Sequence, residues 1–146
     1  MPPELPENFF RQLLIIYEFI FYWLDRPFLP VKMWPEFLKI LKVALEKSLS
    51  QNEIPKEWLE KLWPGDHEYY REQKNKYESS RAPLSLTAKT EIRTVFQKLN
   101  EIETDADKIS KKSEKHKFIK NELSKICRRA FNKCWEIAGM LGFENI

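Results

Sequence analysis

The residues of this sequence best suited to bind a charged partner are basic ones in its last quarter. Residues 111–146 contain nine Lys or Arg and four Glu, an excess of five positive charges, whereas residues 1–110 have a net charge of −2. A row of cations on one rigid element can follow a sugar–phosphate backbone without reading the bases. The nine basic residues are Lys111, Lys112, Lys115, Lys117, Lys120, Lys125, Arg128, Arg129 and Lys133.

Most of these cations fall on one side of a predicted helix. At about 100° per residue, one arc of that helix is apolar, with Ile119, Leu123, Ile126, Ala130 and Cys134. The opposite arc, here called the basic face, comprises Lys117, Asn121, Lys125, Arg128, Arg129, Asn132 and Lys133. Only Glu122 and Glu136 are acidic between Lys115 and Ile137. We therefore expect a cationic band that no nearby anion neutralises.

The candidate nucleic-acid-binding residues are the five cations of the basic face and two lysines at the start of the helix. They are Lys111, Lys112, Lys117, Lys125, Arg128, Arg129 and Lys133. Two other interpretations remain open. The band is an ordinary solvated helix face, or it binds an acidic protein.

Other chemistry finds little support in the sequence. His67 and His116 belong to no metal-binding motif, and neither follows an Arg at the spacing found in small helical nucleases. With only 3 glycines there is no phosphate-cradling loop, and no nucleophile signature occurs. We expect no enzymatic activity, no cofactor and no bound metal.

The cysteines and the apolar segments indicate a compartment. Cys127 and Cys134 lie two helical turns apart, beyond disulfide reach, which predicts reduced thiols and a cytoplasmic protein. The most apolar stretch, residues 9–24, is shorter than the roughly 20 residues that span a bilayer and includes polar side chains. Residues 1–7 are acidic and lack the basic residues of a secretory signal. We expect neither export nor a membrane partner.

The spacing of apolar residues and prolines predicts an all-α fold, a single-domain bundle of five or six helices. Helices are expected at about residues 7–25, 34–49 and 55–62, because Pro6, Pro35 and Pro55 stand at helix starts. The aromatic-rich helices occupy residues 1–63, and a polar connection, residues 64–84, follows as a solvated helix or a loop.

Residues 85–146 are predicted to form a long antiparallel helical hairpin with a basic outer face. Apolar residues from Ile92 to Ile109 recur with helical spacing after a possible cap at Ser85 or Thr87. The hairpin should turn near residues 111–114, and Gly142 is the expected carboxy-terminal cap.

The first predicted helix carries apolar side chains on two sides. It is therefore either the centre of the bundle or half-exposed until a partner, such as another copy, covers it. Trp34, Trp58, Trp63 and Trp135 suit either arrangement.

In the polar connection, Tyr69, Tyr70 and Tyr77 alternate with basic residues. They are either stacking platforms for bases or tyrosines that cover the bundle.

A small helical, non-catalytic domain with a basic helix and surplus apolar surface resembles the small subunits of CRISPR effector complexes. The aromatic opening, residues 6–23, and the basic helix, residues 111–133, look like the carboxy-terminal helical region of the type I-D large subunit, which is also made separately from an internal start. The resemblance implies a subunit that stacks along a ribonucleoprotein and stabilises the target or displaced strand, while guide RNA reads the sequence. Its implied partners are single-stranded DNA or the guide RNA–target backbone, other effector subunits and further copies of itself. The runner-up is a helical adaptor or scaffold that binds no nucleic acid.

Overall fold

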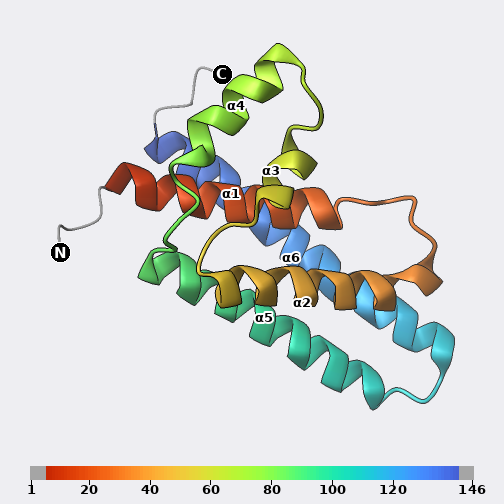
Figure 1. Ribbon diagram of the computed structural model, residues 1–146. Helices are drawn as coiled ribbons and strands as arrows, with labels where there is room; N and C mark the ends of the chain where they lie inside the picture. The colour runs from red at the N-terminus through yellow and green to blue at the C-terminus, as the bar shows by residue number, and fades with distance from the viewer. Residues whose placement is uncertain (1–5, 142–146) are drawn as a thin grey trace.

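The computed structural model describes residues 6–141, with side chains from residue 10 onward. The chain is all-α: about 80% of it is helical, and residues 6–141 contain no strand. Figure 1 shows the helices in chain order. They are α1 (Pro6–Leu24), the short 3-10 helix η1 (Val31–Met33), α2 (Trp34–Gln51), α3 (Lys56–Leu62), α4 (Glu68–Glu78), α5 (Leu86–Asp107) and α6 (Lys112–Met140).

Local signals set most of the helix boundaries. Pro35 lies in the first turn of α2, where its missing N–H leaves no hydrogen bond unmade, and Asn52 ends that helix in the left-handed conformation. Ser85 caps α5, because its hydroxyl accepts a hydrogen bond from the Ala88 N–H at 3.0 Å. The choice between Ser85 and Thr87 is thereby settled. Gly142, the expected carboxy-terminal cap, and the first five of residues 1–7 lie outside the described residues.

The polar connection contains a helix, α4, rather than an extended loop. His67 caps it through its Nδ1, which accepts a hydrogen bond from the Tyr69 N–H at 3.2 Å. Tyr77 near its end is buried and stacks on Trp63, with ring centroids 5.2 Å apart. The buried Tyr77 ring and the His67 cap therefore stabilise α4, whose other residues are mostly polar.

Helix α1 is the centre of the bundle, which confirms central burial over a half-exposed helix. Nine of its side chains are buried on several sides, and α3, α5 and α6 all pack against it. Phe19 lies parallel to Trp58 of α3, with ring centroids 4.1 Å apart. The nine side chains are Gln12, Leu13, Leu14, Ile15, Ile16, Tyr17, Phe19, Ile20 and Leu24.

A buried glutamine ties α1 to the segment that leads into α5. The Gln12 side chain donates a hydrogen bond to the Pro83 carbonyl and accepts one from the Ser85 N–H, both at 2.8 Å. Because a buried amide costs free energy unless it is paired, these bonds explain how a polar residue is tolerated in the core. No helix within residues 6–141 is long and apolar enough to cross a membrane.

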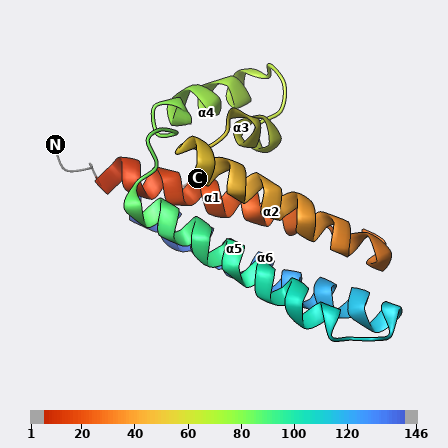
Figure 2. The same cartoon turned by 60° about the horizontal axis from the view of Figure 1, so that its bottom comes forward.

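A short turn joins α5 to α6, and both helices extend from it to the same side, so their chain directions are opposite (Figure 2). The turn comprises residues 108–111 and α6 begins at Lys112, so the prediction of a turn at 111–114 was wrong by about three residues. The sequence carries no capping signal at this boundary, because no side chain caps the start of α6. Helix α6 packs more extensively against α1 than against α5. A closely packed terminal hairpin is therefore not confirmed.

Candidate nucleic-acid interface

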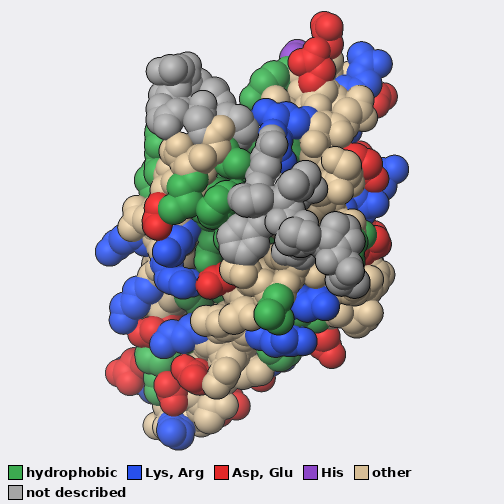
Figure 3. All heavy atoms as spheres, turned by 90° about the vertical axis from the view of Figure 1, so that its left-hand side faces the viewer, with side chains coloured by type: hydrophobic (Ala, Val, Ile, Leu, Met, Phe, Trp, Pro, Cys, Tyr) green, Lys and Arg blue, Asp and Glu red, His purple; other side chains and the backbone are tan. Residues whose placement is uncertain are grey.

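The basic face of α6 is largely exposed. Lys117, Lys125, Arg128 and Arg129 are exposed, as are Lys111 and Lys112 where the helix begins, while Lys133 is half-buried. Figure 3 shows that basic and acidic side chains are interspersed over much of one face of the molecule, where hydrophobic ones gather in the upper half. The exposure of these cations agrees with the sequence prediction. The prediction that no acid lies near them does not agree with the structure.

Three of the seven candidate residues have acidic partners, which corrects the expectation of an unneutralised band. The Nζ atom of Lys125 lies 3.0 Å from Glu122, and that of Lys133 lies 3.4 Å from Glu136. Both pairs span three residues on α6, a spacing at which helical side chains meet. The third pair joins the Arg129 guanidinium to Glu91 of α5 at 3.7 Å. The first two pairs are partly exposed and weak, so a polyanion can displace them.

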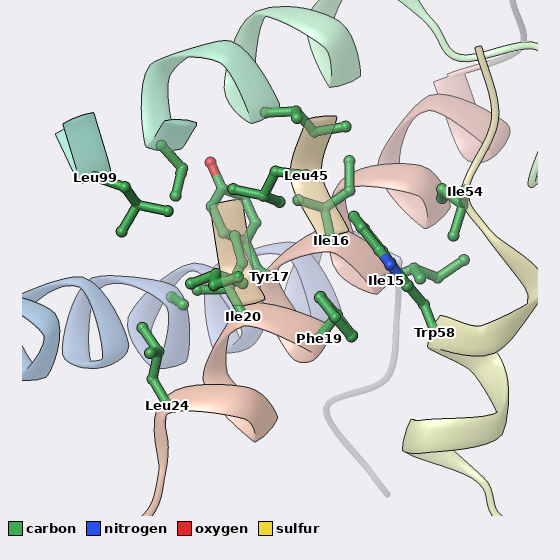
Figure 4. Packing of buried hydrophobic residues seen from close by; sticks show 14 of the residues in the cluster. Ile15, Ile16, Tyr17, Phe19, Ile20, Leu24, Leu45, Ile54, Trp58 and Leu99 are labelled. Carbon is green, nitrogen blue, oxygen red and sulfur yellow. The ribbon is translucent and has the colours of Figure 1, made fainter. Parts of the chain in front are cut away.

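The Arg129–Glu91 pair belongs to a contact between three helices. The Tyr17 hydroxyl of α1 donates a hydrogen bond to the Glu91 carboxylate of α5. Figure 4 shows the Tyr17 side chain with its oxygen directed toward α5, among Ile20 and Leu45. Burial, and then the Glu91 hydrogen bond and charge, raise the pKa of the Tyr17 hydroxyl far above its usual 10, so it remains a neutral donor. Arg129 thus supports the fold in addition to any role in binding.

Four candidate residues have no ion-pair partner among the described residues: Lys111, Lys112, Lys117 and Arg128. Lys117 and Arg128 are eleven residues apart, which places them on the same side of α6 and about 16 Å apart along its axis. Lys111 and Lys112 lie at the amino end of α6, where the peptide dipoles add positive potential. An anion can therefore bind these four candidate residues without breaking an ion pair between described residues.

A groove runs between α5 and α6 beside this band. Its volume is about 650 Å³, and Lys125 and Arg129 line it together with Gln97, Lys98 and two acids, Glu101 and Glu122. The sequence interpretation placed no residue of α5 at the interface. The sequence could have predicted only one feature of this groove, the Glu122–Lys125 ion pair. These residues are three apart, a spacing at which side chains of one helix meet.

Exposed aromatic side chains continue the α6 surface beyond Arg128. The sequence left Trp135 open between the core and an interface and placed Phe131 in the apolar pattern of this helix, not in a binding site. Trp135 is 67% exposed, and Phe131 lies between it and Phe21 of α1, with ring centroids 6.3 and 5.2 Å away. The spacing of Arg128, Phe131 and Trp135, at steps of three and four, was the signal that places them on one side of the helix. A flat aromatic next to a cation suits base stacking or a protein contact.

The tyrosines of α4 are divided between two environments. Tyr77 is buried, Tyr70 is half-buried and Tyr69 is exposed, so only Tyr69 presents much of its ring. The neighbouring Lys74 is engaged by Glu60 at 3.2 Å and by the Gly65 carbonyl at 2.7 Å. This arrangement favours tyrosines that cover the bundle over a stacking platform.

Neither cysteine is part of a disulfide. Burial raises the pKa of the Cys127 thiol to about 11 and that of Cys134 to about 12, which keeps both protonated and poorly nucleophilic. Within residues 10–141 no three His, Cys, Asp or Glu side chains are grouped as metal ligands would be. Comparison with known protein families, with curated proteins and with solved structures finds no match to this chain.

Proposed function

We propose that the protein binds the backbone of nucleic acid through the cations of α6, as a non-catalytic small subunit of a CRISPR ribonucleoprotein effector complex. The observation that carries the binding proposal is the exposure of Lys117 and Arg128 on one side of α6 with no acidic partner within residues 10–141. Lys111 and Lys112 extend the positive surface at the amino end of the helix. The place in a CRISPR complex rests on the resemblance of residues 6–23 and 111–133 described above.

The expected mode of binding is electrostatic and independent of sequence. The exposed part of α6 offers ammonium and guanidinium groups on a rigid rod, and these groups contact phosphates rather than base edges. Guide RNA would supply the sequence recognition, and other subunits and further copies would supply the remaining surface. The free, protonated thiols support placing the protein in the cytoplasm.

A salt titration with a fluorescent single-stranded oligonucleotide tests the proposal. Four phosphate contacts predict a slope of about −2.8 for log affinity against log salt, or about fifty-fold weaker binding at 200 mM than at 50 mM salt. A Lys117→Gln, Arg128→Gln double variant should bind every oligonucleotide more weakly and reduce the slope by about 1.4.

The matched control is a Lys39→Gln, Arg93→Gln double variant. It removes the same two charges from exposed positions on α2 and α5 where no ion pair is formed with a described residue. Arg129 is left unchanged because of its contact with Glu91. No binding at 50 mM salt, or equal effects of the two double variants, would overturn the proposal.

A protein adaptor is the second candidate, and exposed apolar side chains on several elements favour it. Phe28 is 96% exposed, and Val43, Leu86 and Trp135 are also exposed. This function requires a stable protein partner and no affinity for oligonucleotides at any salt concentration. The composition of the complex purified from the native host distinguishes the two, because only a ribonucleoprotein subunit co-purifies with guide RNA and effector subunits.

A further inference from the structure

A hollow of about 320 Å³ opens between α1, α4 and the carboxy-terminal part of α6. Its walls are rich in aromatic rings and its lining contains one carboxyl group. We call it the Glu18 pocket. Its lining residues are Leu14, Glu18, Trp63, Tyr69, Gln73, Lys76, Tyr77, Cys134, Trp135 and Ala138.

The carboxyl group of Glu18 has no counter-ion among the side chains of residues 10–141. No described residue donates a hydrogen bond to it or forms an ion pair with it, although it stands on the most buried helix of the bundle. Burial alone raises its pKa to about 7. Buried carboxylates are normally paired, because an isolated charge in an apolar site is costly. The structure therefore holds an acid that forms no ion pair with a described residue, although the Lys76 side chain lines the same pocket. A cation bound beside Glu18 would stabilise its charged form.

The walls of the pocket suit the same kind of group. Trp63 and Tyr77 are stacked nearly in parallel, and Tyr69 and Trp135 are exposed at the rim. Aromatic faces attract cations within about 6 Å, most strongly where water is excluded. Cations of the chain already approach this wall: the Arg11 guanidinium and the Lys76 ammonium lie 5.5 and 5.9 Å from the centroid of the Tyr77 ring.

We propose that the Glu18 pocket binds an organic cation, an ammonium or guanidinium group, with Glu18 as its counter-ion and the aromatic rings as its walls. A compact cation fits a hollow of this size, and the exposed rim at Trp135 gives it a route of entry. The cation is either a small molecule or the side chain of a partner protein.

The pocket should bind cations only when Glu18 is ionised. The other titratable groups that face Glu18 are Tyr77 of α4 and Cys134 of α6, and burial raises the pKa of each to about 12. Lys76 also lines the pocket, and Tyr69 lies at its rim. With a pKa of about 7, Glu18 is about thirty times more ionised at pH 8 than at pH 5.5, so cation affinity should rise by about that factor.

The test compares choline with 3,3-dimethylbutan-1-ol, its neutral isostere, by tryptophan fluorescence and chemical-shift changes. We expect saturable choline binding at pH 8, weaker by about thirty-fold at pH 5.5 and by tenfold or more in a Glu18→Gln variant. The isostere should bind much more weakly. Trp135→Ala should weaken choline binding, whereas Phe28→Ala, which removes an exposed aromatic outside the pocket, should not.

A second arm uses a short arginine-containing peptide and the same variants. Binding of the peptide but not of choline, lost in Glu18→Gln, supports the proposal and identifies a partner side chain as the source of the cation. Equal affinity for choline and its isostere would show a merely apolar hollow and overturn the proposal. Absence of binding by both choline and the peptide, or binding unchanged in Glu18→Gln, would overturn it too.

Discussion

Replacing Glu18 by Gln should make the protein more stable at neutral and alkaline pH. Gln has nearly the shape of the protonated acid and carries no charge at any pH, so the substitution removes only the cost of ionising a buried carboxyl group. Glu18 has a pKa of about 7 in the folded protein and an ordinary value of 4.5. The folded state thus holds the proton more tightly than the unfolded state does.

The sign of the effect follows from this difference in proton binding. Between pH 4.5 and 7 the folded protein binds more protons than the unfolded chain, so the free energy of unfolding falls as the pH rises through this window. The difference between a pKa of 4.5 and one of about 7 corresponds to about 3 kcal/mol, which is lost in full well above pH 7. The Gln variant escapes that loss, which for a chain of this size is about 6–12 °C in Tm at pH 8.

Urea unfolding of wild type and variant at pH 4, 6 and 8 measures the difference. The gain in unfolding free energy should be near zero at pH 4 and reach about 3 kcal/mol at pH 8. Glu46→Gln, at an exposed position of α2, is the control and should change stability by less than about 0.5 kcal/mol at every pH. A gain of the same size at pH 4 and pH 8 would refute the argument, because it would not arise from ionisation.

Three further substitutions test contacts of the fold. Gln12→Ala leaves the Pro83 carbonyl and the Ser85 N–H unpaired and should lower the free energy of unfolding by about 2–4 kcal/mol in urea denaturation; an effect no larger than that of the exposed Gln97→Ala would show that water replaces the amide. Ser85→Ala removes the cap of α5 and should cost about 1 kcal/mol, with Ser85→Gly much milder; equal losses would contradict a capping role. Arg129→Gln should cost at most about 1 kcal/mol in the same assay, since its ion pair is half-exposed, and a loss several times larger would mean that Glu91 depends on Arg129.

The helices were largely predictable because the signals that start and stop them are local. Pro35, Asn52 and Ser85 act on their own turns of the chain, and the spacing of apolar residues decides which side of each helix is buried. The all-α class follows from these signals. These local signals could not decide whether α1 is the central helix or part of an interface, because that depends on which other helices cover it.

The candidate site was less predictable because charge pairing joins distant parts of the chain. Exposure of Lys117 and Arg128 follows from helix geometry alone, but the partner of Arg129 is Glu91, 38 residues earlier and on another helix. The Glu18 pocket was equally hidden. The sequence shows an acid in an apolar helix, and only the packing of α4 and α6 around it creates a lined hollow without a counter-ion.

The burial of α1 beneath α6 has a consequence for synthesis of the protein on the ribosome. The stretch from Leu13 to Leu24 is the most apolar in the chain, and α6, its principal cover, ends at Met140. At 5–20 residues per second, more than a hundred intervening residues take on the order of ten seconds to translate. During that interval the apolar residues of α1 remain exposed, because α6 has not yet been synthesised to cover them. We expect chaperones that bind exposed apolar segments to bind the nascent chain at this stage.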